Sequence, residues 1–176
     1  MALFEPRVPV ILQSEAPECG IAALAMVASF HGHRTDLSAM RLRLSPSLKG
    51  VTLKHVAQIA ETMNMTARGV QVALESLGKL RLPAILHWDM NHFVVLVKVS
   101  GRKITVHDPA RGKRVLPLDE ASRHFTGVAM EFTPTAGFQP ADERRLVRLR
   151  DLLGPVRGLG RSLGQIFLLE IGRAHV

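Results

Sequence analysis

A single cysteine, Cys19, lies where a polar loop meets an apolar helical pattern. The loop before it carries Gln13, and every residue from 21 to 26 is apolar. A thiolate is stabilised at a helix N-terminus, because free backbone N–H groups and the helix dipole favour negative charge. The position therefore predicts a cysteine nucleophile, although a lone buried cysteine can also serve only as a small apolar side chain.

A cysteine nucleophile requires a histidine within hydrogen-bonding distance, and that histidine requires an acceptor to orient it. The chain has eight histidines, of which His31 and His33 follow the cysteine too closely to face it. We assign His92 as the general base, because it opens the longest predicted strand directly after a polar turn. His87 and His107 are candidates only if their strand ends face the thiol.

Asp108 is the acceptor that strand register selects for His92. If residues 100–102 form a three-residue hairpin loop, Asp108 lies opposite Val94. Side chains alternate along a strand, so His92 shares a face with Val94 and has Asp108 as its diagonal neighbour. A two-residue loop would shift the register by one residue and spoil this arrangement. The predicted register therefore favours Asp108 over Asp89.

Gln13 precedes the cysteine in the same loop and supplies a side-chain amide. This amide can donate a hydrogen bond to the oxyanion that forms when a thiolate attacks a carbonyl, together with the backbone N–H of Cys19. One such donor lowers the barrier by about 2.7–4 kcal/mol. The candidate set thus predicts acyl-transfer chemistry at a carbonyl carbon.

The composition indicates one globular domain and a tail. The chain has 176 residues, and 47% of them are hydrophobic, which is enough for a core. One cysteine excludes an internal disulfide and a cysteine-based zinc cluster, and it fits a reducing compartment. The net charge is +8, but aromatic residues make up only 5% and tyrosine is absent, so a nucleic-acid partner is not expected. A solvated basic face, or one near an anionic membrane surface, explains the charge.

Helical patterns come first along the chain and strand patterns follow. The apolar spacing predicts helices over 17–30, 37–44, 53–63 and 74–80. Alternation and β-branched residues predict strands over 66–72, 83–88, 92–99, 103–107, 114–116 and 128–132. Helices followed by an antiparallel sheet make an α+β domain.

The domain is predicted to end at residue 135, because residues 133–140 are rich in proline and glycine. An arginine-rich segment then precedes an apolar stretch, which is the order expected on the cytoplasmic side of a membrane entry. We interpret residues 136–176 as a linker and the start of a transmembrane domain, with a docked amphipathic helix as the alternative. The last six residues resemble a translated sequencing adapter, so nothing functional is inferred from His175.

The segment 13–20 resembles the N-terminal peptidase domain of bacteriocin-processing ABC transporters, most of all the colicin V exporter type. Four more segments resemble the same family in the same order: 48–53, 77–83, 87–96 and 108–112. The resemblance covers about residues 8–135. Many members carry Asp where Glu18 stands and a second cysteine where Ala23 stands, and neither position belongs to the catalytic set.

The resemblance implies a papain-like α+β fold, with N-terminal helices packed on an antiparallel sheet. It also implies a cysteine endopeptidase that cleaves a leader peptide after a Gly-Gly pair. Cys19 maps to the nucleophile and His92 to the general base and acid. Asp108 maps to the orienting residue and Gln13 to the oxyanion donor. No metal or cofactor is expected for this domain, whereas ATP and Mg²⁺ are expected for an ATPase domain outside this segment.

The implied partners are a leader-bearing precursor peptide and the protein's own transmembrane and ATPase domains. The full transporter is expected to be a homodimer, with this domain at the cytoplasmic face of the bacterial inner membrane. A shallow apolar groove would hold an amphipathic leader helix. A non-catalytic substrate-docking domain and another papain-like enzyme, such as an acyltransferase, are the alternatives; the presence of all four candidate residues favours the peptidase.

Overall fold

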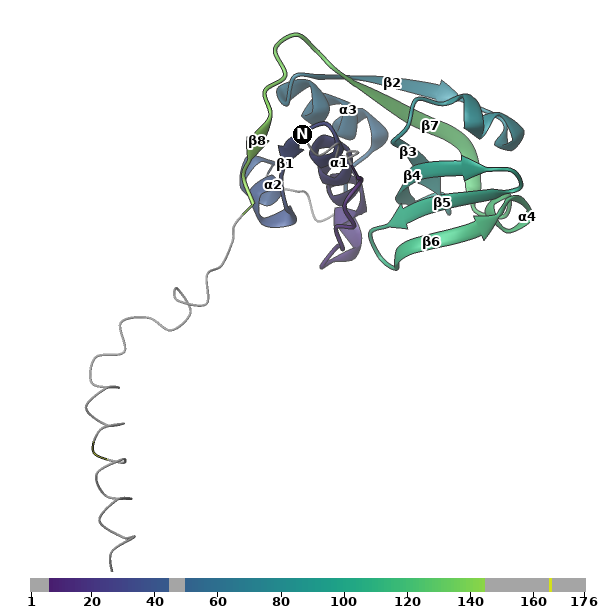
Figure 1. Ribbon diagram of the computed structural model, residues 1–176, viewed down its shortest axis with the longest axis horizontal. Helices are drawn as coiled ribbons and strands as arrows, with labels where there is room; N and C mark the ends of the chain where they lie inside the picture. The colour runs from purple at the N-terminus through teal and green to yellow at the C-terminus, as the bar shows by residue number, and fades with distance from the viewer. Residues whose placement is uncertain (1–6, 45–49, 145–164, 166–176) are drawn as a thin grey trace, which may run out of the picture. The chain divides into compact units, whose positions relative to one another are not determined.

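The computed structural model describes residues 7–44, 50–144 and 165 (Figure 1). The chain divides into two compact units, Met1–Arg145 and Leu146–Val176. All helices and strands labelled in Figure 1 belong to the first unit. The predicted start of a transmembrane domain lies outside the described residues, apart from residue 165. Within the part of the chain that is described, no helix combines the length and apolar character needed to cross a bilayer.

The N-terminal elements are helical, as the sequence predicts. A 3₁₀ turn, η1 (Ala16–Glu18), runs directly into α1 (Cys19–Phe30), and α2 (Leu37–Leu44) and α3 (Leu53–Thr62) follow. Every residue of α1 from 19 to 28 is buried, because the helix is apolar on all sides. The next two helices begin at side-chain caps: Asp36 accepts from the N–H of Ala39, and Thr52 accepts from the N–H of His55.

The second half of the unit forms one antiparallel sheet with strand order β2-β7-β3-β4-β5-β6. Its strands are β2 (Met65–Gln71), β3 (Ala84–Trp88), β4 (His92–Ser100), β5 (Lys103–Asp108), β6 (Gly112–Pro117) and β7 (Phe125–Pro134). The short helices η2 (Leu74–Lys79) and α4 (Leu118–Ala121) lie between strands along the chain. Each predicted helix and strand overlaps an observed one, which confirms the α+β prediction.

The central strand β3 and the first half of β4 are buried on both faces of the sheet. The alternation of side chains along β4 divides the core in two. Phe93 and Val95 pack in one cluster with the apolar residues of α1. Val94 and Leu96 pack in a second cluster that includes Leu77 of η2. Because α1 packs directly on β4, the first residue of the helix and the first residue of the strand are held in one rigid body.

The turn between β4 and β5 differs from the predicted one. Ser100 pairs with Lys103, so the loop contains the two residues Gly101 and Arg102. Gly101 has a φ of 55°, in the left-handed region that two-residue hairpin loops require. The predicted three-residue loop is therefore wrong, because glycine can provide the tight turn without a third loop residue.

A β-bulge in β4 compensates for the shorter loop. The register shifts between Leu96 and Lys98, which leaves Val97 as the extra residue of the strand. Beyond this bulge Val95 pairs with His107, which is the register predicted from the sequence. The side-chain facing predicted at the start of β4 is therefore present, although its cause is the bulge and not the loop.

The described chain stays with the first unit beyond residue 135. A short strand, β8 (Ala141–Asp142), pairs in parallel with β1 (His33–Arg34), just after α1. The N–H of Glu143 donates to the carbonyl of Arg34 at 2.8 Å. The proline- and glycine-rich segment that the sequence assigns to a linker therefore includes the end of β7 and a connection to a strand on the helical side of the unit.

Gly20 gives a test of the contact between α1 and its neighbours. A Cβ at this position would meet the side chains of Val51, Val56 and Phe93, and the closest of these contacts cannot exist without movement. We expect Gly20→Ala to lower the free energy of unfolding by about 1–3 kcal/mol, as overpacking does. Urea denaturation followed by circular dichroism measures this change.

The control is Gly69→Ala, because a Cβ at Gly69 meets nothing within 4 Å. This variant should be as stable as the parent chain or slightly more stable, since alanine lowers the conformational entropy of the unfolded chain. Equal stability of the two variants would contradict the close packing of Val51, Val56 and Phe93 around the start of α1.

Candidate active site

Cys19 is the first residue of α1 and follows η1 without a break. Its side chain belongs to the main core cluster, and the residue is only 5% exposed. The N-terminal end of a helix favours negative charge, because its first N–H groups have no partner within the helix. The fold therefore places the one thiol of the described chain at the N-terminal end of a helix.

His92 is the first residue of β4, and it connects the thiol to a carboxylate. Its Nε2 lies 2.8 Å from Oδ1 of Asp108, and the ring also hydrogen-bonds the side chain of Cys19. Since Nε2 is taken by the carboxylate, Nδ1 is the nitrogen left for the sulfur. Among the histidines that the structure describes, His92 is the one that hydrogen-bonds the thiol.

The surroundings of His92 favour its charged form. Burial alone would lower the pKa of the ring, but the hydrogen bonds to Asp108 and Cys19 outweigh it and raise the pKa to about 9. Burial likewise raises the pKa of Asp108, yet hydrogen bonds from His92 and from the N–H of Ala110 lower it below its ordinary value. The pair is therefore poised as an imidazolium beside a carboxylate.

Gln13 lies at the edge of the same site. Its backbone N–H donates to the carbonyl of Pro109 at 2.8 Å, which ties its loop to the residue after Asp108. Gln13, His92 and Asp108 line one cavity of about 270 Å³ together with Trp88. The side-chain Oε1 of Gln13 is buried without a hydrogen-bond partner among the described residues. An amide held in this way can turn its N–H₂ group toward an oxyanion.

Glu18 is a positioning residue that the sequence analysis left outside the site. It is 4% exposed, and its Oε2 accepts hydrogen bonds from the N–H groups of Ser14 and Glu15, both at 2.9 Å. Its other oxygen pairs with Arg41 of α2, and this bond is the main reason that the pKa of Glu18 is lowered. The buried carboxylate thus pins the loop after Gln13 to the start of α1. Its place directly before the cysteine was the available sequence signal, whereas nothing in the sequence pointed to Arg41.

Asp89, the alternative acceptor, is engaged elsewhere. Its Oδ1 lies 2.6 Å from Nδ1 of His124. The backbone N–H of Asp89 also donates to the carbonyl of His124. The ring of His124 stacks on Trp88 at 5.4 Å between centroids. Asp89 and Met90 both have positive φ, so the turn before His92 is tight and benefits from this anchor.

The other two candidate histidines also have partners away from the thiol. Nδ1 of His87 lies 2.9 Å from Oγ1 of Thr126. Nδ1 of His107 lies 3.1 Å from the carbonyl oxygen of Pro9. The structure therefore brings Cys19, His92 and Asp108 into one hydrogen-bonded series, with Gln13 on the same cavity, and leaves the competing histidines outside it.

Comparison with known proteins decides the family. The sequence profile described as the Peptidase C39 family matches residues 7–137, a range that contains all four candidate residues. The chain belongs to the peptidase C39 family. This membership confirms the predicted resemblance and the prediction of a cysteine peptidase domain.

Related C39 proteins in bacteria are secretion and processing proteins. The chain is 42% identical to the colicin V secretion/processing ATP-binding protein CvaB of Escherichia coli, over 96% of the chain and 24% of that protein. It is 28% identical to the lactococcin-G-processing and transport ATP-binding protein LagD of Lactococcus lactis subsp. lactis, over 77% of the chain and 20% of that protein. The chain thus spans about a quarter of the length of these Escherichia coli relatives.

Solved structures agree with the C39 fold. A double glycine motif protease from an AMS/PCAT transporter, in complex with the leader peptide, superposes with a TM-score of 0.69. It is 37% identical and covers 77% of this chain and 97% of its own. The peptidase domain of Streptococcus ComA is 20% identical, with a TM-score of 0.67 over 73% of this chain and 100% of its own, and it supports the fold alone. The predicted papain-like class is confirmed.

The charge of His92 can be tested by titration. Asp108→Asn removes the carboxylate that favours the imidazolium, so the pKa of His92 should fall below the parent value of about 9. NMR of the histidine ring resonances between pH 5 and pH 10 measures this change. Asp89→Asn is the matched control, because Asp89 binds His124 and not His92. A similar fall in both variants would contradict the assignment of Asp108 as the partner.

Proposed function

We propose that this chain is the leader peptidase domain of a peptide exporter, and that it cleaves a precursor peptide after a Gly-Gly pair. The observation that carries the proposal is the hydrogen-bonded series from the thiol of Cys19 through His92 to Asp108. The printed names of the relatives support it, since they join peptide processing to secretion. The related solved protease acts on the double glycine motif and binds a leader peptide.

The geometry supports a two-step mechanism. The thiolate of Cys19 attacks the carbonyl carbon of the scissile bond, and the C–N bond breaks as His92 gives its proton to the leaving amine. The neutral His92 then takes a proton from water, and the resulting hydroxide attacks the thioester; the C–S bond breaks, which releases the carboxylic acid and restores the thiolate of Cys19 beside protonated His92. Asp108 holds the ring in one orientation during both steps. No metal or cofactor takes part in either step.

Gln13 stabilises the oxyanion in both steps of this proposal. Its side-chain amide and the backbone N–H of Cys19 donate to the oxygen on which negative charge develops. The hydrogen bond from the N–H of Gln13 to Pro109 supports this role, because it fixes the glutamine relative to the Asp108 loop. The carboxylate of Glu18 holds the same loop from the other side.

A Gly-Gly pair suits the burial of the reacting groups. Cys19 is 5% exposed and the side chain of His92 is 17% exposed, so a substrate backbone must approach closely. A glycine next to the scissile bond has no Cβ to collide with the walls. Larger residues would hold the carbonyl away from the sulfur, and the attack would slow because the reacting atoms must come within about 3–3.5 Å.

The rest of the proposed transporter lies outside this chain. We place this domain with a transmembrane domain and an ATPase domain that binds ATP and Mg²⁺, in a homodimeric transporter. The domain would work at the cytoplasmic face of the bacterial inner membrane, where the precursor is made. The relatives support the ATPase and transport parts of this proposal, because their names include ATP binding together with secretion or transport and the chain covers 24% and 20% of their length.

The first test concerns the nucleophile. Cys19→Ala should abolish cleavage of a peptide that carries a Gly-Gly leader, while the affinity for that peptide stays within about twofold of the parent value. Mass spectrometry of the products measures cleavage, and calorimetry measures binding. Cleavage by this variant would refute Cys19 as the nucleophile. An uncleaved peptide with the parent chain would favour a docking domain without catalysis.

The second test concerns the oxyanion donor. Gln13→Ala should lower kcat about 10²–10³-fold with little change in KM, because the donor acts mainly in the transition state. Ser14→Ala is the control, since the hydrogen bond from Ser14 to Glu18 uses its backbone N–H and survives the substitution. Steady-state kinetics on the same peptide separate the two parameters. A rise in KM at constant kcat would assign Gln13 to ground-state binding.

A further inference from the structure

Two arginines line the cavity that contains the catalytic imidazole. Arg111 and Arg114 share this cavity, of about 270 Å³, with Gln13, His92 and Asp108. The two-step mechanism uses neither arginine. Pockets that hold whole small-molecule ligands measure about 300–1,000 Å³, so this one suits one or two side chains of a bound peptide.

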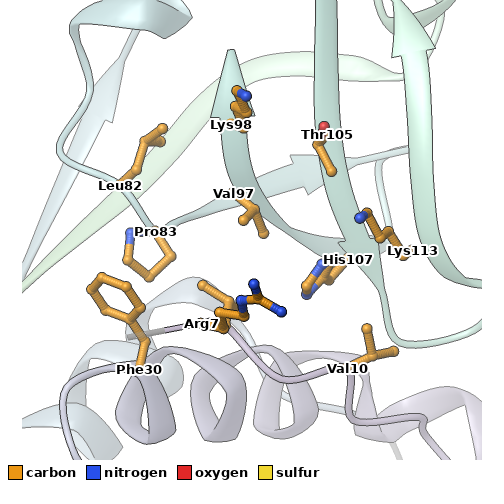
Figure 2. Close-up of a pocket in the computed structure, with 11 residues that line it drawn as sticks. Arg7, Val10, Phe30, Leu82, Pro83, Val97, Lys98, Thr105, His107 and Lys113 are labelled. Atoms are coloured by element: carbon orange, nitrogen blue, oxygen red, sulfur yellow. The ribbon is translucent and has the colours of Figure 1, made fainter. Parts of the chain in front are cut away.

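Strand pairing directs Arg114 to the catalytic side of the sheet. Arg114 pairs with Val106, and Val106 and Asp108 project from the same face of β5 because side chains alternate along a strand. Lys113, the preceding residue, pairs with His107 and projects from the opposite face. Figure 2 shows Lys113 beside His107 in another cavity, of about 570 Å³. These two neighbouring cations of β6 therefore serve different sides of the sheet, and of the two it is Arg114 that belongs to the site.

Arg111 lies in the turn directly after Asp108. Its N–H donates to the carbonyl of Asp108 at 3.2 Å, which closes the turn between β5 and β6. Burial raises the pKa of Asp108, but the hydrogen bonds from His92 and Ala110 and the nearby positive charge of Arg111 lower it. The guanidinium of Arg111 is therefore close enough to act on a charge at the centre of the site.

Both arginines keep donors free for a ligand. Arg114 donates to Oε1 of Glu120 through Nη2 at 3.1 Å, and this bond uses one of the five N–H donors of its guanidinium. Arg111 is exposed, and it forms no ion pair with another described residue. A planar guanidinium matches a carboxylate through two parallel hydrogen bonds. The free donors therefore favour a carboxylate as the ligand.

The two carboxylates that line the cavity are engaged with histidines and not with the arginines. Asp108 pairs with His92, and Asp89 pairs with His124. Neither carboxylate is needed to fill the free donors of the guanidinium groups. An acidic side chain brought in by a bound peptide would meet these donors without displacing a partner of the catalytic pair.

The position of His92 determines which part of a substrate enters this cavity. In the proposed mechanism His92 gives its proton to the leaving amine, so that nitrogen and the residues that follow it lie on the imidazole side of the scissile bond. His92 lines the cavity, whereas Cys19 is not among the lining residues. A peptide that runs from the thiol past the imidazole therefore enters the cavity with the residues that follow the Gly-Gly pair.

We propose that Arg111 and Arg114 form a subsite for an acidic side chain at the first or second residue after the Gly-Gly pair. Each extended residue spans about 3.3 Å, so these two positions are the ones that stay near the imidazole. Both belong to the released peptide, so the subsite selects the product of cleavage and not the leader. This assignment rests on the proposed function, because it takes the Gly-Gly pair to precede the bond that Cys19 attacks.

The test compares synthetic peptides that differ only after the Gly-Gly pair. Ala-Leu-Ala-Gly-Gly-Glu-Ala-Leu-Ala and Ala-Leu-Ala-Gly-Gly-Ala-Glu-Leu-Ala, both with blocked ends, carry glutamate at the first or the second position, and each has a counterpart with glutamine. Mass spectrometry of timed samples gives kcat/KM for cleavage by the full chain. We expect glutamate to be preferred about fivefold over glutamine at one of the two positions, as partly exposed ion pairs allow. Equal rates within both pairs of peptides would overturn the proposal.

Variants of the two arginines locate this preference. Arg111→Ala and Arg114→Ala should each reduce the preference to within about twofold. The measured quantity is a ratio between two peptides for one variant, so a general loss of activity or stability cancels. Lys113→Ala is the matched control, because it removes the same charge from the opposite face of β6, and it should keep the preference. A preference that survives both arginine variants, or that falls equally in the control, would contradict the assignment.

A binding measurement without cleavage separates this proposal from the proposed function. The released segments Glu-Ala-Leu-Ala and Ala-Glu-Leu-Ala, with free amino termini, are titrated into the Cys19→Ala chain, and NMR shifts of the Ala110 and Arg114 amides report binding. One of them should bind about fivefold more tightly than its glutamine counterpart. Equal binding within both pairs would overturn the subsite.

The two measurements together assign a failure to one proposal or the other. Cleavage of all four peptides at one rate would refute the subsite alone. Tighter binding of a glutamate segment, when the parent chain cleaves neither these peptides nor a Gly-Gly leader peptide, would refute the proposed function and leave an anion site without a role in cleavage.

Discussion

The site depends on one imidazole that contacts two layers of the fold. His92 reaches a thiol on the first residue of α1 with one ring nitrogen and a carboxylate at the end of β5 with the other. The helix and the sheet must therefore keep a constant separation, or one of these bonds is lost. The core between α1 and β4 provides that constancy, because packed interiors are nearly incompressible.

Two hydrogen-bonded loops complete this arrangement around the imidazole. The loop that carries Gln13 is held by Pro109 on the sheet side and by the carboxylate of Glu18 on the helix side. The turn before His92 is held by the pair of Asp89 and His124. Each loop is therefore fixed by hydrogen bonds to residues outside it. The positions of the reacting groups depend on these bonds and not on the stiffness of the loops.

Much of the fold and the candidate site could be predicted from the sequence, but not always for the right reason. Periodicity and caps place the helices and strands, and the motif around Cys19 gives the family. The register at His92 was predicted from a three-residue loop, whereas a tighter turn and a bulge at Val97 produce it together. A bulge has no clear sequence signal, because it depends on how neighbouring strands twist and pack.

Contacts between residues that are far apart in the chain could not be predicted from the sequence. Arg41 pairs with Glu18 from another helix. Strand β8 pairs with β1, although the two strands lie near opposite ends of the unit's sequence. Such contacts join residues that are far apart in the chain, and no local pattern marks them.

The burial of α1 limits how this enzyme can change. The helix is fully enclosed and several of its positions are alanine, so neighbouring elements lie against its backbone with no slack to shift or tilt it. The sulfur is consequently stationary, and drift in substrate preference has to occur in the surrounding loops and strand ends. Proteins that evolve from such a chain would change which peptides they cleave, while the position of the Cys19 sulfur in the fold stays the same.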